Sequence, residues 1–351
     1  MVQRAVLDTR LAVQRALRRW LRADPGAEHG RRLVLVALSG GADSLALAAA
    51  AAYEAGRAGL RAGAVVVDHG LQHGSAEVAA RAAEQGRALG LDPVLVSRVR
   101  VEAGGGPEAA AREARYAAFA EAVEATEAAA ILTAHTRDDQ AEQVLLALAR
   151  GSGLRSLAGI PQCRPLDPAS SAREERALIL RPFLGEAPVI TRTATEAACA
   201  EQGLHPWTDP HNVDRSYARV RARETVLPVI ERELGPGVAE ALARTADLAR
   251  EDADALDTLA ERVAAERVVF DEGRSAEIPI QILSELPSAL RGRVIRIIAA
   301  RGFGAHLSRE HTGAVARLVT AWRGQGSIDV PGASVTRRNG LLVFTARRRA
   351  G

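Results

Sequence analysis

The sequence predicts an α/β protein with a twisted parallel sheet, helices on both faces of that sheet, and a smaller, mostly helical domain that ends in a β-hairpin. Three features predict this fold. Short apolar runs alternate with helical patterns in the first part of the chain, glycine-containing turns follow several of these runs, and helical patterns dominate from about residue 216. Strands that alternate with helices are typical of βαβ units, whose parallel sheet is covered on both faces.

The predicted elements of the first domain follow one another in regular order. The expected strands are residues 33–38, 64–68, 94–96 and 130–133, and the expected helices start at residue 43 and then cover 75–89, 107–126 and 138–150. Ahead of them, an amphipathic helix is predicted from apolar residues at helical spacing, which are Val2, Val6, Val13, Leu17 and Trp20. Ligands of parallel sheets bind at the carboxyl ends of the strands, so one binding site is expected there.

The remainder of the chain is predicted to form a second domain. The expected boundary separates a catalytic domain, residues 1–215, from a substrate-recognition domain, residues 216–351. The helical patterns and the hairpin of this second domain are residues 216–267, 286–300, 308–322 and 328–344. Asn339-Gly340 is the typical turn of a two-residue hairpin loop. Within the first domain, residues 161–175 are rich in proline, serine and charge, and they predict a mobile loop.

Composition restricts the chemistry. The chain has no lysine, so all 46 basic residues are arginine, which excludes a Walker P-loop and a Schiff base to pyridoxal phosphate. Cys163 and Cys199 lack the spacing of a metal or redox pair. No apolar run approaches the ~18 residues of a membrane span, so the cytoplasm is the expected location. The net charge is only +3, but arginines cluster over residues 215–223 and 337–349.

The first motif that indicates chemistry joins a predicted strand to a predicted helix. It consists of Ser39, Gly40, Gly41, Ala42, Asp43 and Ser44. The glycines allow close approach to the backbone, and successive N–H groups at a helix N-terminus favour an anion such as a phosphate. A carboxylate beside phosphates is repelled unless a cation lies between them, so Asp43 is the expected Mg²⁺ ligand. The alternative is a plain capped turn, with Ser39 or Asp43 as the N-cap.

Two further motifs are expected at the same edge of the sheet. After the fourth strand come His135, Asp138, Asp139 and Glu142, and Asp138 and Glu142 share one helix face. A carboxylate cluster suits an ammonium group, a metal ion, or both, although the helix dipole alone also favours Asp138 in a first turn. On the preceding helix, Arg112 and Arg115 project together at i, i+3. A solvated arginine face is the alternative for this pair.

The residues 39–44 resemble the PP-loop of the N-type ATP pyrophosphatases, which have a Rossmann-like parallel sheet and include several tRNA-modifying enzymes. Taken together, the order and spacing of the motifs resemble those of the tRNA(Ile)-lysidine synthetases over about residues 33–234. The motifs that carry this second resemblance are residues 39–44, 111–116, 135–142, 150–153, 181–184, 207–212 and 219–223.

The resemblance implies a reaction and a set of roles. The family uses ATP and Mg²⁺ to adenylate the wobble cytidine in the CAU anticodon of tRNA(Ile), and free L-lysine then displaces AMP to form lysidine, which changes decoding from AUG to AUA. By this resemblance we expect Asp139 to recognise lysine, and Glu142 or Asp138 to handle a metal ion or a proton. Stabilisation of the adenylate and the polyphosphate is expected from Arg112, Arg115 and His135. Contacts with tRNA phosphates are expected from Arg219, Arg221 and Arg223.

Three other functions remain open on the sequence. A PP-loop tRNA thiolase generally relies on paired or catalytic cysteines, and Cys163 and Cys199 lie in no such context. A glutamine-dependent synthetase needs an amidotransferase partner or domain. A nucleotide sensor without catalysis accounts for the PP-loop but not for the acidic cluster and the arginines together. The oligomeric state is left open, with a homodimer as one candidate.

Overall fold

The computed structural model describes residues 3–23, 33–70, 74–99, 107–151, 153–167, 177–209, 214–271 and 273–347. Its internal contacts divide the chain into two compact units, residues 1–247 and 248–351, and the division falls within α10 (Val238–Arg267). This division concerns packing alone, and the functional boundary between residues 215 and 216 stays a prediction.

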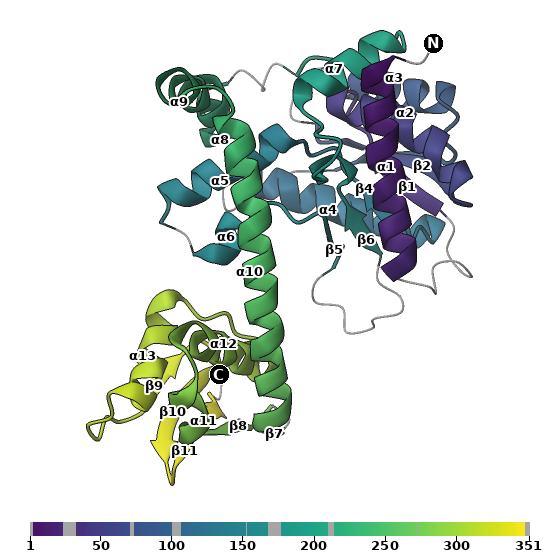
Figure 1. Ribbon diagram of the computed structural model, residues 1–351. Coiled ribbons are helices and arrows are strands. Elements are labelled where there is room, and N and C mark those ends of the chain that lie inside the picture. Colours follow the sequence, from purple (N-terminus) through teal and green to yellow (C-terminus); the bar gives the residue numbers. More distant parts are fainter. Residues whose placement is uncertain are drawn as a thin grey trace. The chain divides into compact units, whose positions relative to one another are not determined.

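The first unit is built on a six-stranded sheet with the order β3-β2-β1-β4-β6-β5 (Figure 1). The strands are β1 (Leu33–Ala37), β2 (Arg61–Asp68), β3 (Val94–Arg98), β4 (Ala130–Leu132), β5 (Cys163–Pro165) and β6 (Leu178–Leu180). All neighbours pair in parallel except β5, which runs antiparallel to β6 at the edge. The predicted parallel sheet is therefore confirmed, while β6 was not predicted. The predicted loop 161–175 contains the strand β5, and its residues 168–175 lie outside the described part of the chain.

The sheet is covered on both faces, as predicted, because side chains of a strand alternate between its two sides. Val34 and Val36 of β1 pack in a core with α1 (Arg4–Ala23), α2 (Ala42–Arg57), α3 (Ser75–Ala88) and α7 (Arg192–Glu201). Leu33 and Leu35 face the opposite side, where they pack with Phe119 of α4 (Pro107–Thr126).

The N-terminal helix α1 confirms the predicted amphipathic pattern. Its buried residues are Val6, Thr9, Ala12, Val13, Leu17 and Trp20, and Val2 lies outside the described residues. The remaining elements of this unit are α5 (Arg137–Ala149), α6 (Leu154–Leu157), η2 (Pro182–Leu184), α8 (Ala218–Arg221), η4 (Ala222–Val226) and α9 (Leu227–Leu234). The element η4 is a π-helical turn that ends two residues before Pro228, which has no N–H to donate to a carbonyl one turn back.

The second unit pairs helices with a five-stranded antiparallel sheet of order β7-β8-β11-β10-β9. Its elements after α10 are β7 (Val269–Asp271), β8 (Ser275–Pro279), α11 (Ile280–Glu285), α12 (Ser288–Phe303), α13 (Arg309–Thr320), β9 (Ile328–Val330), β10 (Ala333–Arg338) and β11 (Leu341–Ala346). The predicted hairpin is β10–β11, and Asn339 and Gly340 both have positive φ at its turn, 49° and 75°. The strands β7 and β8 were not predicted. Arg348 and Arg349 of the C-terminal arginine cluster lie outside the described residues.

Candidate active site

The glycine loop lies at the carboxyl end of β1, where it leads into α2. Gly40 has a φ of +84°, and a Cβ there would come within 3.3 Å of the Ala82 Cβ, so this position requires glycine. Ser44 Oγ donates to the Gly41 carbonyl at 2.9 Å and lies 3.1 Å from Ser39 Oγ, so the two hydroxyls are joined. Gly41 is the N-cap of α2 and no side chain caps this helix. The alternative of Ser39 or Asp43 as the N-cap is therefore wrong.

Asp43 connects the glycine loop with the first turn of α7. Its carboxylate accepts a hydrogen bond from the Thr195 hydroxyl and lies 3.9 Å from Nε of Arg192. Burial raises the pKa of Asp43 from 3.8 to about 6; Thr195 and Arg192 oppose this rise, while Asp139 and Asp138 add to it. Burial thus disfavours the charged form of this carboxyl group, and a bound cation would stabilise that form.

The three acids of α5 have different partners. Asp139 closes a capping box: its Oδ2 accepts from the backbone N–H of Thr136 at 2.8 Å, and its Oδ1 lies 3.3 Å from Nη2 of Arg192. Asp138 accepts from the backbone N–H of Arg192 at 2.7 Å. Helix capping therefore explains the position of Asp139 Oδ2. Within the described part of the chain, Oδ1 contacts Arg192 alone.

Glu142 is fully buried and surrounded by arginine. Nε of Arg223 lies 2.7 Å from Oε1, Nε of Arg219 lies 3.7 Å from Oε2, and Nη2 of Arg192 lies 3.5 Å from Oε1. Both carboxylate oxygens are therefore already occupied by cations. Arg221, the third arginine predicted to contact tRNA, is exposed and donates instead to the carbonyls of Arg215 and Ser216.

Arg192 is a central residue that the sequence analysis missed. Its guanidinium contacts Asp43, Asp139 and Glu142, and so connects the glycine loop with α5. A signal was present in the sequence: Thr191 is a typical N-cap, and Arg192 directly follows it. A cation at the first position of a helix opposes the helix dipole, so it indicates an anionic partner elsewhere in the fold.

His135 and the arginine pair of α4 complete the site. His135 Nδ1 lies 3.1 Å from Thr133 Oγ1. Burial lowers the pKa of His135 to about 3, despite the opposing charge of Asp139, so the imidazole is neutral at pH 7.

Arg112 is exposed, and its Nη2 donates to the Tyr116 hydroxyl at 3.2 Å. Burial lowers the pKa of Arg115 and of His69, and Arg115 adds to the lowering at both His69 and His135. The charge of Arg115 therefore acts on two histidines, one after β2 and one after β4.

Among the described residues, no group of three or more His, Cys, Asp or Glu side chains could hold a metal ion by itself. Among the described acids of the glycine loop and of α5, Asp43 and Asp138 have no arginine side chain at hydrogen-bond distance.

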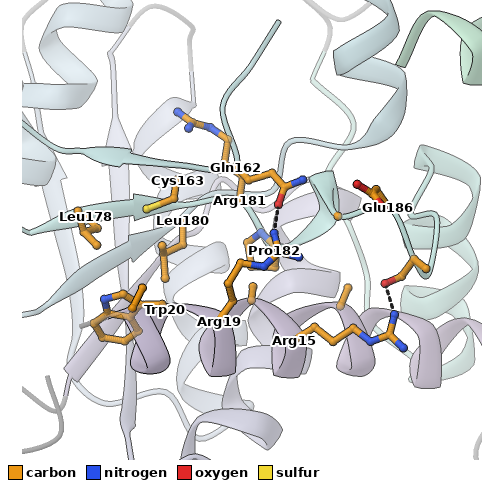
Figure 2. A pocket seen from close by; sticks show the side chains of 15 residues that line it. Arg15, Arg19, Trp20, Gln162, Cys163, Leu178, Leu180, Arg181, Pro182 and Glu186 are labelled. Carbon is orange, nitrogen blue, oxygen red and sulfur yellow. Dashed lines mark hydrogen bonds between the residues drawn. The ribbon is translucent and has the colours of Figure 1, made fainter. Parts of the chain in front are cut away.

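A separate cavity of about 420 Å³ lies between α1 and residues 162–187 (Figure 2). Arg15 crosses its rim, where Nη1 donates to the Ala187 carbonyl at 2.6 Å, and Arg19 donates to Gln162 (Figure 2). None of the residues predicted to act in catalysis, to bind ATP or to bind tRNA lines it. The motif residues Pro210, His211 and Asn212, and Ser152 of the glycine turn, lie outside the described residues.

Known families match both ends of the chain. The model described as the PP-loop domain matches residues 10–230, and the model described as the TilS substrate binding domain matches residues 279–343. The fold and the glycine loop thus define a protein of the PP-loop class, whose members use ATP. Within that class, the chain belongs to the tRNA(Ile)-lysidine synthase family.

Curated relatives support this membership over nearly the whole chain. The tRNA(Ile)-lysidine synthase of Leifsonia xyli subsp. xyli is 58% identical, with 91% of this chain and 90% of the relative covered. That of Thermobifida fusca is 52% identical, with 95% and 97% covered, and that of Mycobacterium bovis is 47% identical, with 88% and 90% covered. A solved U34-tRNA thiolase, NcsA from Methanococcus maripaludis, aligns at a TM-score of 0.49 with 15% identity, over 68% of this chain and 80% of that one.

In the part of the chain that the structure describes, no helix is both long enough and apolar enough to cross a membrane.

Proposed function

We propose that this protein uses ATP to join free L-lysine to the wobble cytidine of tRNA(Ile) with a CAU anticodon, forming lysidine. In the first step the 2-oxo oxygen of the cytidine attacks the α-phosphorus of ATP and pyrophosphate leaves. In the second, the lysine ε-amine attacks the adenylated carbon, the C–O bond breaks, AMP leaves with that oxygen, and the amine gives up a proton. Because the proposed substrate is a tRNA, we also expect the protein in the cytoplasm.

The observation that carries this proposal is the bridge made by Arg192, which connects Asp43 of the glycine loop with Asp139 and Glu142. The proposed ATP site and the proposed acidic acceptor site are therefore adjacent at one edge of the sheet. A nucleotide sensor needs only the first of these two sites. A ligase needs both, because the activated base must meet the amine while AMP is still in place.

The residues of the glycine loop, Ser39 to Ser44, are proposed to bind the ATP phosphates through their N–H groups and hydroxyls. Mg²⁺, bound by Asp43 and assisted by Asp138, would neutralise phosphate charge. Glu142 is less suited to a metal ion because arginines contact both of its oxygens, at 2.7 Å and 3.3 Å for Arg223. Neutral His135 and the cations Arg112 and Arg115 are proposed to stabilise the adenylate and the departing pyrophosphate.

A thiolase is the second candidate, and the cysteines do not favour it. Burial raises the pKa of Cys163, and it raises the pKa of Cys199 to about 11, with the nearby Asp43 charge acting in the same direction. A reactive cysteine needs the opposite shift, because the thiolate is the nucleophile. Neither thiol therefore has the lowered pKa that sulfur transfer by a cysteine requires.

The test is incorporation of labelled lysine into a tRNA(Ile) transcript with a CAU anticodon, in the presence of ATP and Mg²⁺. Acid-stable label that disappears when the wobble cytidine is replaced by uridine is the expected result. Pyrophosphate release on addition of bulk tRNA without lysine incorporation would contradict the proposal and direct attention to another acceptor. Sedimentation of the same preparation decides whether the protein is the homodimer named above as a candidate.

A further inference from the structure

The cavity beside α1 is bordered by two neighbouring rows of side chains of that helix (Figure 2). Residues four apart lie on the same side of a helix. One row is apolar and consists of Ala12, Ala16 and Trp20. The row next to it is cationic and consists of Arg15 and Arg19. A volume of about 420 Å³ suffices for a small organic ligand, which would meet both rows at once.

The wall across from α1 adds further apolar groups at one end of the cavity. Leu178 and Leu180 of β6 line this wall together with Cys163 of β5. Figure 2 shows these three side chains at the same end of the cavity as Trp20, whereas Arg15 lies at the other end. Apolar and cationic side chains are thus separated along the cavity, which suits a ligand with an apolar body and a charged head.

The unused donors of the two arginines determine the charge of that head. Arg15 donates through Nη1 to the Ala187 carbonyl, and Arg19 donates through Nη1 to Gln162. Within the described part of the chain, Nε and Nη2 of both arginines have no acceptor. Both side chains are exposed, and Glu186 is the one carboxylate among the described residues that line the cavity. Guanidinium donors in excess over carboxylates favour an anion.

Trp20 contributes a further unused donor. Its ring is only 5% exposed, and its indole Nε1 has no acceptor in the described part of the chain. A buried N–H without a partner is unfavourable, and an acceptor atom on a ligand can satisfy it. Arg181 also lines the cavity, but it is buried and its Nη1 donates to the Pro161 carbonyl at 2.7 Å, so the exposed cations are Arg15 and Arg19.

We propose that this cavity binds a small organic anion. Its apolar body packs between α1 and β6, and its carboxylate, sulfonate or phosphate group accepts hydrogen bonds from Arg15 and Arg19. None of the residues predicted to act in catalysis or to bind ATP or tRNA lines the cavity, so this is a second ligand site. The inference does not depend on the proposed function.

The first test measures the binding of anilinonaphthalene sulfonate by its fluorescence, with ATP and Mg²⁺ present so that the probe does not enter the proposed ATP site. Phenylnaphthylamine, which has the same rings without the sulfonate, is the neutral comparison. In a variant with both Arg15→Gln and Arg19→Gln, the Kd of the sulfonate should rise about 3- to 10-fold, while the Kd of the neutral probe changes less than about twofold.

The matched control is Arg18→Gln, an exposed arginine of the same helix that does not line the cavity. This control should leave both Kd values unchanged. A double variant that raises the Kd of both probes by the same factor, or of neither, would overturn the inference, because the arginines would then not select for charge.

Ala16→Leu tests the apolar row of the cavity. The larger side chain would occupy the space beside α1, so binding of both probes should be lost. Both probes binding to the folded variant with the Kd of the unmodified protein would overturn the inference.

The last test locates the probe in the unmodified protein, so it decides even if a variant does not fold. Cys163 lines the cavity and is exposed, whereas Cys199 is buried. Alkylation by iodoacetamide at alkaline pH, followed by mass spectrometry, gives the rate of modification of each thiol. Anilinonaphthalene sulfonate should slow the alkylation of Cys163 in proportion to the fraction of protein bound. An unchanged rate at Cys163 with the probe bound would place it elsewhere and overturn the inference.

Discussion

Nε of Arg223 lies 2.7 Å from Oε1 of Glu142, a residue 81 positions earlier in the chain. This ion pair joins the acidic helix α5 to the π-helical turn η4, which lies in the segment predicted to contact tRNA. Because Arg219 also contacts Glu142, two of the three predicted tRNA contacts are connected to the acidic cluster. A tRNA phosphate that binds Arg219 or Arg223 would therefore also change the charge around Glu142.

Glu142→Gln is expected to destabilise the protein. The substitution leaves Arg192, Arg219 and Arg223 without their shared carboxylate, and removal of one partner from a buried ion pair costs about 3 kcal/mol or more. Urea unfolding measures the loss, with the exposed Glu233→Gln as the control. Unfolding free energies that agree within about 0.5 kcal/mol would show that the pair contributes little to stability.

Asp43→Asn tests the raised pKa of Asp43. The native pKa of about 6 exceeds the ordinary 3.8, so the native state keeps a proton that the unfolded chain loses between these pH values. The contribution of Asp43 to the unfolding free energy therefore falls as the pH rises from about 4 to about 6. Relative to the unmodified protein, the unfolding free energy of the variant should therefore rise by up to about 3 kcal/mol over that range. Each tenfold difference between the proton affinities of the native and unfolded states corresponds to about 1.4 kcal/mol.

The measurement for Asp43 is urea unfolding at several pH values between 4 and 7. Asp252→Asn, at an exposed position of α10, serves as the matched control. If the unfolding free energies of Asp43→Asn and of the unmodified protein change equally with pH, burial does not raise the pKa of Asp43.

Gly40→Ala is expected to weaken both the fold and the binding of ATP. The φ of +84° is disfavoured for alanine by about 1–2 kcal/mol, and the new Cβ would lie 3.3 Å from that of Ala82. Gly56→Ala is the matched control in the adjoining helix α2, where a Cβ meets nothing within 4 Å. This control should be neutral or stabilise by up to about 1 kcal/mol, since glycine is unfavourable within a helix. Calorimetry gives ATP affinity, and equal affinities for the two variants would contradict a role for the loop backbone.

Arg221→Gln and Arg223→Gln should differ in their effects. Arg221 is exposed and, among the described residues, contacts backbone carbonyls alone. Its loss should weaken tRNA binding and reduce the slope of log K against log salt by about 1, with kcat unchanged. Arg223 contacts Glu142, so its loss should lower kcat as well. Filter binding over a range of salt concentrations and turnover at saturating tRNA measure these effects. The same kcat for both variants would show that the contact with Glu142 has no catalytic consequence.

Asp139→Asn is expected to raise the KM for lysine by about 10- to 100-fold while the KM for ATP changes less than about twofold. Asn keeps an oxygen that can accept from the Thr136 N–H, so the capping box is largely preserved. Initial rates of lysine incorporation at varied lysine give the result. An unchanged KM for lysine would remove Asp139 from lysine recognition and leave it as a helix-capping residue.

Much of the fold could be predicted because local patterns are strong where both faces of a strand are buried. The apolar run of β1, the alanine-rich α2 and the turn at Asn339-Gly340 each indicate their structure within a few residues. The short strands β5 to β8 could not be predicted in this way. Each has three to five residues, too few for a periodic pattern, and each exists because a neighbour supplies its hydrogen bonds.

Residue types and spacings alone identify most of the groups that carry the chemistry: the glycine loop, the acids of α5 and the arginines that follow all belong to patterns that local geometry explains. How these groups pair depends on the tertiary structure. Arg192 meets Asp139 and Glu142 across 53 and 50 residues of chain, and it meets Asp43 across a still longer stretch. Such pairings depend on where the sheet brings the ends of separate elements together. A pattern within one element does not predict which residues of other elements will lie beside it.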